Sequence, residues 1–408
     1  MPNLKKVMMG AAGAGGGGKT LWAWGRNRYG GLGLGNTTDY SSPVQIGAKG
    51  DWQRASVAGD GHSLFIKPDG TMWSCGRNDH GQLGLGDTTD RSSPVQIGAL
   101  TTWSFINTID CGLSNQHRGR SAAIKTDGTL WMWGDNTDGS LGLGDTTDRS
   151  SPTQVGSLTN WKKLVMGRDF SVALKTDGTI WSWGSNLSGQ LGQNTSVGSD
   201  VSSPVQIGSL TTWIDVGAAG NGNAGAARSD SKMYCWGNNY YGNLGNNERG
   251  GSGGMPNRSS PVLVVGGHNF TSIAASYQGW VCVTDTNTMF SWGRNIGGVL
   301  GQSTSTLAVI SPVQIGSLTT WASWNAKDDA GNFVETVGNT NSSSNGGETM
   351  STVKTKTDGT LWVWGTNTYG QLGLGNTTSG YSSPVQLGSS TSWVAGYGGF
   401  SSGWAFEA

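Results

Sequence analysis

The chain has 408 residues, of which 70 are glycine and 20 are tryptophan, while only 13% are charged. This composition departs far from ordinary usage and favours a turn-dense β protein over a helical enzyme. The 26 lysines and arginines balance 26 aspartates and glutamates, so no net charge attracts the chain to nucleic acid or to an anionic membrane. No apolar run reaches the length of a membrane-spanning helix, and membrane insertion is not predicted.

Residues 1–18, "MPNLKKVMMGAAGAGGGG", precede any recognisable structural pattern. Their apolar stretch is too weak and too diluted by glycine for a signal peptide. We expect an N-terminal arm on a flexible glycine hinge. The predicted attachment residues of this arm are Leu4, Lys5, Lys6, Met8 and Met9. An alternative is that "LKKVMMG" forms a strand, because it is similar to "WKKLVMG" at residues 161–167.

From residue 19 onward the chain is built of repeats. A glycine that follows an aromatic or cysteine-containing segment recurs seven times, at Gly25, Gly76, Gly134, Gly184, Gly237, Gly293 and Gly365. Seven proline-led segments, mostly "SSPVQIG", close the units. A period of this length indicates that each unit is one supersecondary structure that buries its apolar face against its neighbours.

The unit at residues 161–208 contains four short strand candidates: "WKKLVMG", "FSVALKT", "TIWSWG" and "SPVQIG". We name the four positions a, b, c and d. Asp177-Gly178 joins b to c, and this dipeptide is a strong signal for a tight hairpin. Four antiparallel strands, repeated seven times, are typical of the blades of a β-propeller.

Most tryptophans fall at fixed places in the repeat. Two residues that are two apart in strand c lie on one face of the strand, which suits the packing of one blade on the next. Seventeen of the 20 tryptophans occupy strand a or strand c and are interpreted as scaffold. Any tryptophan that stacks on carbohydrate is therefore expected among Trp280, Trp324 and Trp404.

The phase of the repeat predicts how the ring closes. The chain begins with strands c and d, in residues 21–47, and ends with strands a and b, in residues 391–408. We predict that the strand around Trp404 to Glu407 pairs with Leu21 to Gly25. Such pairing completes a seventh blade and removes the free edges of an open array.

These motifs resemble a known family. The segments "WGTNTYGQLGLG" and "SSPVQLG", with "KTDGTLW" before them, are similar to the regulator of chromosome condensation repeat, and the resemblance covers residues 19–408. It implies an all-β fold, a seven-bladed propeller with four antiparallel strands in each blade. It implies no single function, since one scaffold hosts many, and no residue here carries over to guanine-nucleotide exchange.

Loop lengths differ between the two ends of the predicted ring. Connections b–c and d–a are short and uniform, whereas every insertion falls in a–b (109–120, 325–351) or c–d (193–201, 246–258, 302–310). In an up-and-down blade these two connections emerge at one end, which we predict to be the recognition surface. Its candidate binding residues are Gln116, His117, Arg118, Arg120, Arg249, Trp324, Lys327, Asp328, Asp329, Phe333 and Glu335.

The sequence offers little sign of chemistry. The four histidines, His62, His80, His117 and His268, have no metal-pair spacing. Aspartates that recur in "TTD", such as Asp148, suit a turn better than a catalytic pair. The four cysteines, Cys75, Cys111, Cys235 and Cys282, have no C-x-x-C spacing and are interpreted as apolar fillers. No catalytic residue, metal or cofactor is predicted.

Three functions are compatible with these features. The lysine- and methionine-containing start and the Asn/Ser/Thr/Gly-rich loops are similar to bacteriophage virion proteins, which implies an arm that docks to other virion proteins and a loop face that meets a host protein or glycan. Oligomerisation is compatible with this hypothesis. The second hypothesis is a cellular protein-interaction propeller in the cytoplasm. The third, a glycan-active enzyme, requires converging carboxylates such as Asp328, Asp329 and Glu335.

Overall fold

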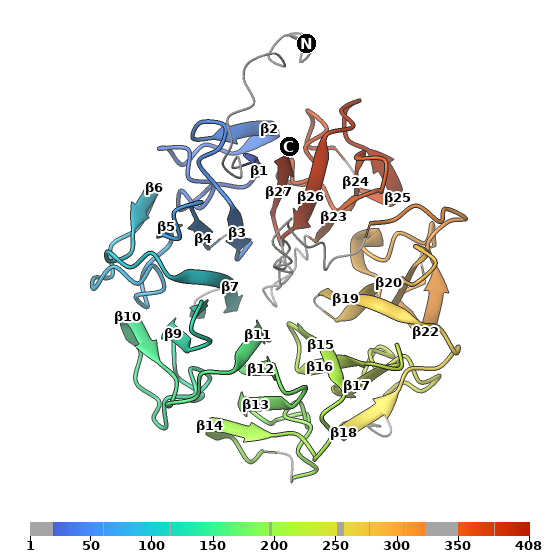
Figure 1. The fold of residues 1–408 in the computed structure, drawn as a ribbon. Coiled ribbons are helices and arrows are strands. Elements are labelled where there is room, and N and C mark those ends of the chain that lie inside the picture. The colour runs from blue at the N-terminus through green and yellow to red at the C-terminus, as the bar shows by residue number, and fades with distance from the viewer. Residues whose placement is uncertain are drawn as a thin grey trace.

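A computed structural model describes residues 19–408, except for 60, 114–115, 196–197, 251–256, 277, 305, 323–349 and 379; for 111–113 and 116–117 it describes only the backbone. Seven antiparallel sheets form a closed ring (Figure 1). Six sheets have four strands and one has three. The predicted all-β propeller is therefore confirmed.

Each blade runs from strand a near the centre of the ring to strand d at its outside (Figure 1). The a strands are β3 (Arg54–Val57), β7 (Trp103–Leu113), β11 (Trp161–Met166), β15 (Trp213–Ala219), β19 (Phe270–Ser276) and β26 (Trp393–Gly398). The b strands are β4 (His62–Ile66), β8 (Gln116–Lys125), β12 (Phe170–Lys175), β16 (Asn223–Arg228), β20 (Gly279–Thr284), β23 (Ser351–Thr355) and β27 (Ser402–Glu407).

The c and d strands complete the sheets. The c strands are β1 (Thr20–Gly25), β5 (Met72–Gly76), β9 (Leu130–Gly134), β13 (Ile180–Gly184), β17 (Met233–Gly237), β21 (Met289–Arg294) and β24 (Leu361–Gly365). The d strands are β2 (Tyr40–Ile46), β6 (Arg91–Gln96), β10 (Arg149–Gln154), β14 (Val201–Gln206), β18 (Arg258–Leu263), β22 (Ala308–Gln314) and β25 (Tyr381–Gln386). One 3₁₀ turn, η2 (Ile296–Gly298), follows β21.

We number the blades from the closing one. Blade 1 is β26-β27-β1-β2, blade 2 is β3 to β6, and blades 3 to 7 follow in chain order. In blade 1, β27 pairs with β1 in the register Leu21↔Phe406 and Ala23↔Trp404, which confirms the predicted closure. In blade 7, Trp321 forms an isolated bridge with Lys356 at the place of strand a. Residues 323–349 lie outside the described part.

Tryptophans in strand c join neighbouring blades. In blade 4, Trp183 is fully buried, and its indole Nε1 donates to the carbonyl of Ser140 in blade 3, at 2.9 Å. The same contact to the preceding blade is made by Trp24, Trp133, Trp236, Trp292 and Trp364. The predicted packing role of these tryptophans is confirmed. Trp280 and Trp404 are also fully buried, so the expectation that they stack on carbohydrate is wrong; Trp324 lies outside the described residues.

Hydrogen bonds divide the connections between two ends of the ring. The first residue after strand c donates its amide to a carbonyl near the a–b connection of its own blade, as Ser185 does to Asp169 at 2.8 Å. At the other end, the first residue of strand a bonds the b–c turn of the preceding blade, as Trp161 does to Gly128 at 3.1 Å. We call these the loop end and the turn end. The predicted sorting of connections is therefore confirmed.

Candidate recognition surface at the loop end

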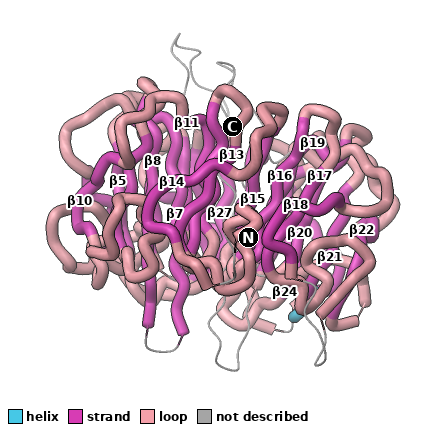
Figure 2. Tube along the Cα trace, turned by 90° about the horizontal axis from the view of Figure 1, so that it is seen from below, coloured by secondary structure: helices cyan, strands magenta, loops and turns pink. Residues whose placement is uncertain are grey.

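The hairpin of β7 and β8 extends the loop end of blade 3. Its pairing runs without a further register shift from Phe105↔Ile124 to Leu113↔Gln116, whereas the corresponding hairpin of blade 4 stops at Met166↔Ser171. Figure 2 shows this hairpin projecting beyond the rest of the ring. The sequence pattern predicted an irregular loop at 109–120. The structure instead continues the ladder, because paired strands satisfy backbone groups that a loop would leave to water.

Arg118 lies at the base of this hairpin and reaches the next blade. Its guanidinium forms ion pairs with Asp138 and, at 3.4 Å, with Asp169 of blade 4. Burial lowers the pKa of Arg118, but the carboxylates of Asp138, Asp169 and Asp135 outweigh this effect and raise it overall. Arg118 is thus a partly exposed cation held between two blades.

Arg120, predicted as a binding residue, belongs to the interior. Its side chain is fully buried, and Nη2 donates to the carbonyl oxygens of Gly167, at 2.7 Å, and Arg168. Arg118 and Arg120 are two residues apart and therefore lie on the same face of β8. They differ in depth, because Arg120 is covered by Gly167 and Arg168 of blade 4 whereas Arg118 lies further toward the tip of the hairpin. Arg120 therefore anchors blade 3 to blade 4 and presents no accessible surface.

The other predicted binding residues divide into two groups. Arg249 is exposed in the c–d loop of blade 5 and makes no hydrogen bond or ion pair with the described residues. Gln116 and His117 lie in the ladder of β8, near the tip of the projecting hairpin, but their side chains are outside the described part. Trp324, Lys327, Asp328, Asp329, Phe333 and Glu335 lie outside it altogether, as do Leu4, Lys5, Lys6, Met8 and Met9.

A cluster that the sequence patterns did not reveal joins blades 2 and 3. Nδ1 of His80 lies 3.0 Å from Oδ2 of Asp148 and 3.7 Å from Oδ2 of the buried Asp135. Burial lowers the pKa of His80, but the bond to Asp148 and the nearby carboxylates raise it overall. The other oxygen of Asp148 accepts the amide of Asn136 at 2.8 Å, so the predicted turn-stabilising role of this aspartate is confirmed.

The three donor atoms of this cluster lie within 4.8 Å of one another, a grouping of the kind that holds metal ions. Each is already occupied by a protein partner, since Oδ2 of Asp135 also accepts the hydroxyl of Thr137 at 2.9 Å. Hydrogen bonding between blades accounts for the arrangement. No spacing rule identifies it, because the residues come from different repeats.

The cluster occupies a contact position that recurs around the ring. Both positions are counted from the glycine that ends strand c. The fourth residue after this glycine in one blade contacts the first residue after the equivalent glycine in the next blade. At three junctions this pair is a tyrosine under a guanidinium, in Tyr29–Arg77, Tyr241–Arg294 and Tyr369–Arg26, at 4.5 to 4.8 Å. An alignment of the repeats places His80 and Asp135 at these two positions, but the contact between the positions is visible only in the structure.

Among the cysteines, Cys75, Cys235 and Cys282 are buried free thiols. Burial raises the pKa of all three, so they stay protonated and unreactive at neutral pH. Their predicted role as apolar fillers is confirmed. The side chain of Cys111 lies outside the described part.

The repeated blades and their contacts define a family. Residues 20–66, 69–115, 127–174, 177–224 and 358–396 match the family described as Regulator of chromosome condensation (RCC1) repeat. The matches cover more than half of the sequence. The chain belongs to this family.

Two curated relatives and one solved structure are similar to the chain. The Ultraviolet-B receptor UVR8 of Arabidopsis thaliana is 33% identical over 70% of this chain and 63% of its own length. The X-linked retinitis pigmentosa GTPase regulator of Canis lupus familiaris is 36% identical over 36% of this chain and 14% of its own length. Prp20p of Saccharomyces cerevisiae shares the fold, with a TM-score of 0.74 and 18% identity over 97% of this chain and 92% of the other.

The chain thus spans less than two thirds of the curated relatives named above. Within the described residues, we find no helix of the length and apolarity that crossing a bilayer requires.

Proposed function

We propose that this protein is a non-enzymatic binding propeller of the cell that recognises a protein partner through its loop end. The observation that carries this proposal is the asymmetry of the ring. The turn end repeats one local structure, whereas the loop end carries the projecting β7–β8 hairpin and the longer c–d loops. Binding residues concentrate on variable loops held by a rigid scaffold.

The chemistry of the loop end suits a polar protein partner. Arg118 presents a cation fixed by Asp138 and Asp169, and Arg249 presents one that has no partner among the described residues. Arginine is enriched at protein interfaces because its planar group makes several hydrogen bonds at once. An acidic segment on the partner would complement Arg249, whereas the charge of Arg118 is already balanced by its carboxylates.

The relatives support a cellular role. One is named a receptor and another a GTPase regulator, and neither name describes a virion component. A cytoplasmic location accords with this role. The hypothesis of a bacteriophage virion protein, with an arm that docks to the particle, draws no support from these relatives. It rests on residues 1–18 and stays a prediction, as does the glycan-active alternative, whose carboxylates Asp328, Asp329 and Glu335 lie outside the described residues.

One experiment tests the proposed surface. Residues 110–119 are replaced by residues 168–169, which stand at the equivalent place in blade 4 between Gly167 and Phe170. The wild-type chain, this variant and a control variant, Leu158→Ser at the turn end, are each tagged and purified from the native cells. The amount of each co-purifying protein is then compared among the three. We expect the shortened hairpin to lose the partner and Leu158→Ser to retain it. The opposite result would overturn the proposal.

The virion alternative has its own test. Deletion of residues 1–18 should leave the propeller folded while abolishing incorporation into particles, if the arm docks there. Tail or capsid genes beside the coding sequence would favour the alternative, and their absence together with a cytoplasmic partner would favour the cellular role.

A further inference from the structure

The junction between blades 1 and 2 departs from the repeat. Where six other c strands place a tryptophan against the preceding blade, blade 2 has Cys75, whose thiol lies 3.4 Å from the carbonyl of Gly31. Phe65 of β4 occupies the position where blades 3 and 4 have Ala123 and Ala173. A smaller residue in one strand is therefore accompanied by a larger one in its neighbour.

Trp52 is also held differently from its equivalents. Its ring packs on Phe65 with centroids 4.9 Å apart, and its Nε1 donates to the carbonyl of Ile46 at 3.0 Å. The indole nitrogens of the equivalent tryptophans have no hydrogen-bond acceptor among the described residues: Trp103, Trp161, Trp213, Trp321 and Trp393. Three linked differences thus reshape this one junction.

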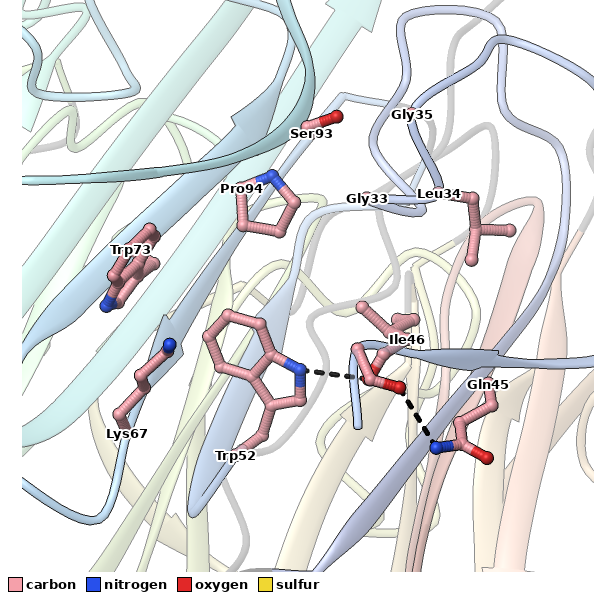
Figure 3. Close-up of a pocket in the computed structure, with 11 residues that line it drawn as sticks. Gly33, Leu34, Gly35, Gln45, Ile46, Trp52, Lys67, Trp73, Ser93 and Pro94 are labelled. Atoms are coloured by element: carbon pink, nitrogen blue, oxygen red, sulfur yellow. Dashed lines mark hydrogen bonds between the residues drawn. The ribbon is translucent and has the colours of Figure 1, made fainter. Parts of the chain in front are cut away.

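A hollow of about 360 Å³ opens at this junction. Blade 1 contributes Leu34 and Ile46 to its lining, and blade 2 contributes Pro94, Trp73 and Lys67. Figure 3 shows the Lys67 ammonium between the rings of Trp52 and Trp73, with Leu34 and Ile46 on the opposite side. Apolar walls with a few placed polar groups are typical of small-ligand sites, and the volume is at the low end of their range.

The polar groups of the hollow are almost all occupied. Trp52 donates to Ile46, Trp73 donates to the hydroxyl of Thr71 at 2.9 Å, and Gln45 donates to the carbonyl of Gly47 at 2.9 Å. The ammonium of Lys67 lies 4.4 Å from the ring centroid of Trp73 and 5.3 Å from that of Trp52. Within the described part of the chain it has no oxygen acceptor for its three N–H donors.

We propose that this hollow binds a small organic carboxylate with a flat apolar body. The carboxylate accepts charge-assisted hydrogen bonds from Lys67, and the apolar body lies between Trp73 and Pro94 on one side and Leu34 on the other. The two indoles fix the cation by cation–π contact, so little side-chain freedom is lost when the ligand binds.

The test uses 4-fluorophenylacetate as probe and 4-fluorophenylacetamide as its uncharged analogue, each titrated to about 10 mM while ¹⁹F linewidths are recorded. Wild-type protein should bind the acid at least about ten-fold more tightly than the amide, since only the acid supplies a charged acceptor. Lys67→Met should lower affinity for the acid about ten-fold, and Lys67→Arg should restore it in part.

Lys125→Met is the matched control, because Lys125 lies over Trp103 and Trp131 in the same way at the next junction. It should leave the affinity unchanged. Leu34→Trp keeps the ammonium of Lys67 but fills the hollow with a larger side chain, and it should abolish binding. This variant provides a second test if Lys67→Met is poorly folded. No binding by the wild-type chain, equal affinity for acid and amide, or an equal effect of Lys125→Met and Lys67→Met would each overturn the proposal.

Discussion

The turn end and the loop end of the ring use polar residues in different ways. At the turn end, Asp127 accepts the amide and hydroxyl of Thr129, and the Thr129 hydroxyl accepts the indole N–H of Trp131, all within a few residues. At the loop end, polar side chains also form contacts between blades, as Arg118 does with Asp169 and His80 with Asp148.

This difference explains why one end is uniform and the other varied. When all donors and acceptors of a hydrogen-bond network lie within a few residues of one another, the network is reproduced wherever that sequence is repeated. The aspartate–threonine–tryptophan network accordingly recurs at Asp69, Asp177 and Asp358. A contact between blades depends on two repeats at once, so a change in either one alters it. The loop end can therefore diversify without disturbing the hairpins that hold each blade together.

Glycine-to-alanine substitutions at the two ends should differ most in their cost to stability. Gly128 has φ +78°, and an added Cβ would lie 2.0 Å from the carbonyl of Thr159. Gly86 at the loop end has φ +82°, but its nearest neighbour would be 3.7 Å away. Gly128→Ala should cost about 2–5 kcal/mol from backbone strain and overpacking together, whereas Gly86→Ala should cost about 1 kcal/mol from strain alone. Urea unfolding measures both, and equal losses would contradict the difference in packing.

Asp127→Ala tests the closed network of the turn end. Loss of two acceptor contacts should lower the free energy of unfolding by about 1–2 kcal/mol at pH 7. Bonds from the Thr129 hydroxyl and amide lower the pKa of Asp127, so the contribution of its charge is complete above the unfolded pKa of about 3.9 and is lost as the pH falls through the folded pKa. Asp127→Asn keeps the Oδ1 acceptor and should lose less free energy of unfolding than Asp127→Ala. The urea midpoint of Asp127→Asn should approach that of the wild type at pH 3. A difference in midpoint that persists at pH 3 would exclude the charge of Asp127 as the cause.

His80→Gln tests the contact between blades at the loop end. Because the folded state raises the pKa of His80, its stabilising contribution is complete below the unfolded pKa of about 6.5 and is lost as the pH rises through the folded pKa. The half-exposed pair should contribute less than about 1 kcal/mol. Urea midpoints of wild type and variant should differ more at pH 5.5 than at pH 8.5.

His268 is the control of opposite sign. Burial, with the charge of Lys232, lowers the pKa of His268, so the folded state favours its neutral form and loses stability as the pH falls below about 6.5. His268→Gln should therefore remove a penalty at pH 5.5 that is absent at pH 8.5. If the difference in urea midpoint from the wild type changed with pH in the same direction for both variants, neither histidine would be the cause of the pH dependence.

Leu187→Ala should have the smallest effect. Leu187 in the c–d loop of blade 4 is 67% exposed, and such surface substitutions change the free energy of unfolding by less than about 0.5 kcal/mol. A larger loss in urea unfolding would show that the c–d loops of the loop end also stabilise the scaffold.

The repeated part of the candidate site was predictable, whereas its individual contacts were not. The position of the insertions follows from antiparallel connectivity, so loop lengths in the sequence are enough to assign the loop end. Arg118 and Arg120, two residues apart in β8, nevertheless differ in that one is partly exposed and the other fully buried. Their depth depends on how closely blade 4 approaches, which the sequence of blade 3 does not encode.

The number of blades, the order of strands, the closure of β1 on β27 and the burial of the strand c tryptophan directly before the closing glycine follow from the sequence alone, because each depends on local periodicity and on glycines with turn geometry. Tertiary structure decided what meets across the junctions. Lys163 and Asp215, in neighbouring a strands, form a buried ion pair of 2.5 Å, and His80 meets Asp135 and Asp148. Such contacts depend on the distance and rotation between blades, which follow from the packing of all seven units into one closed ring.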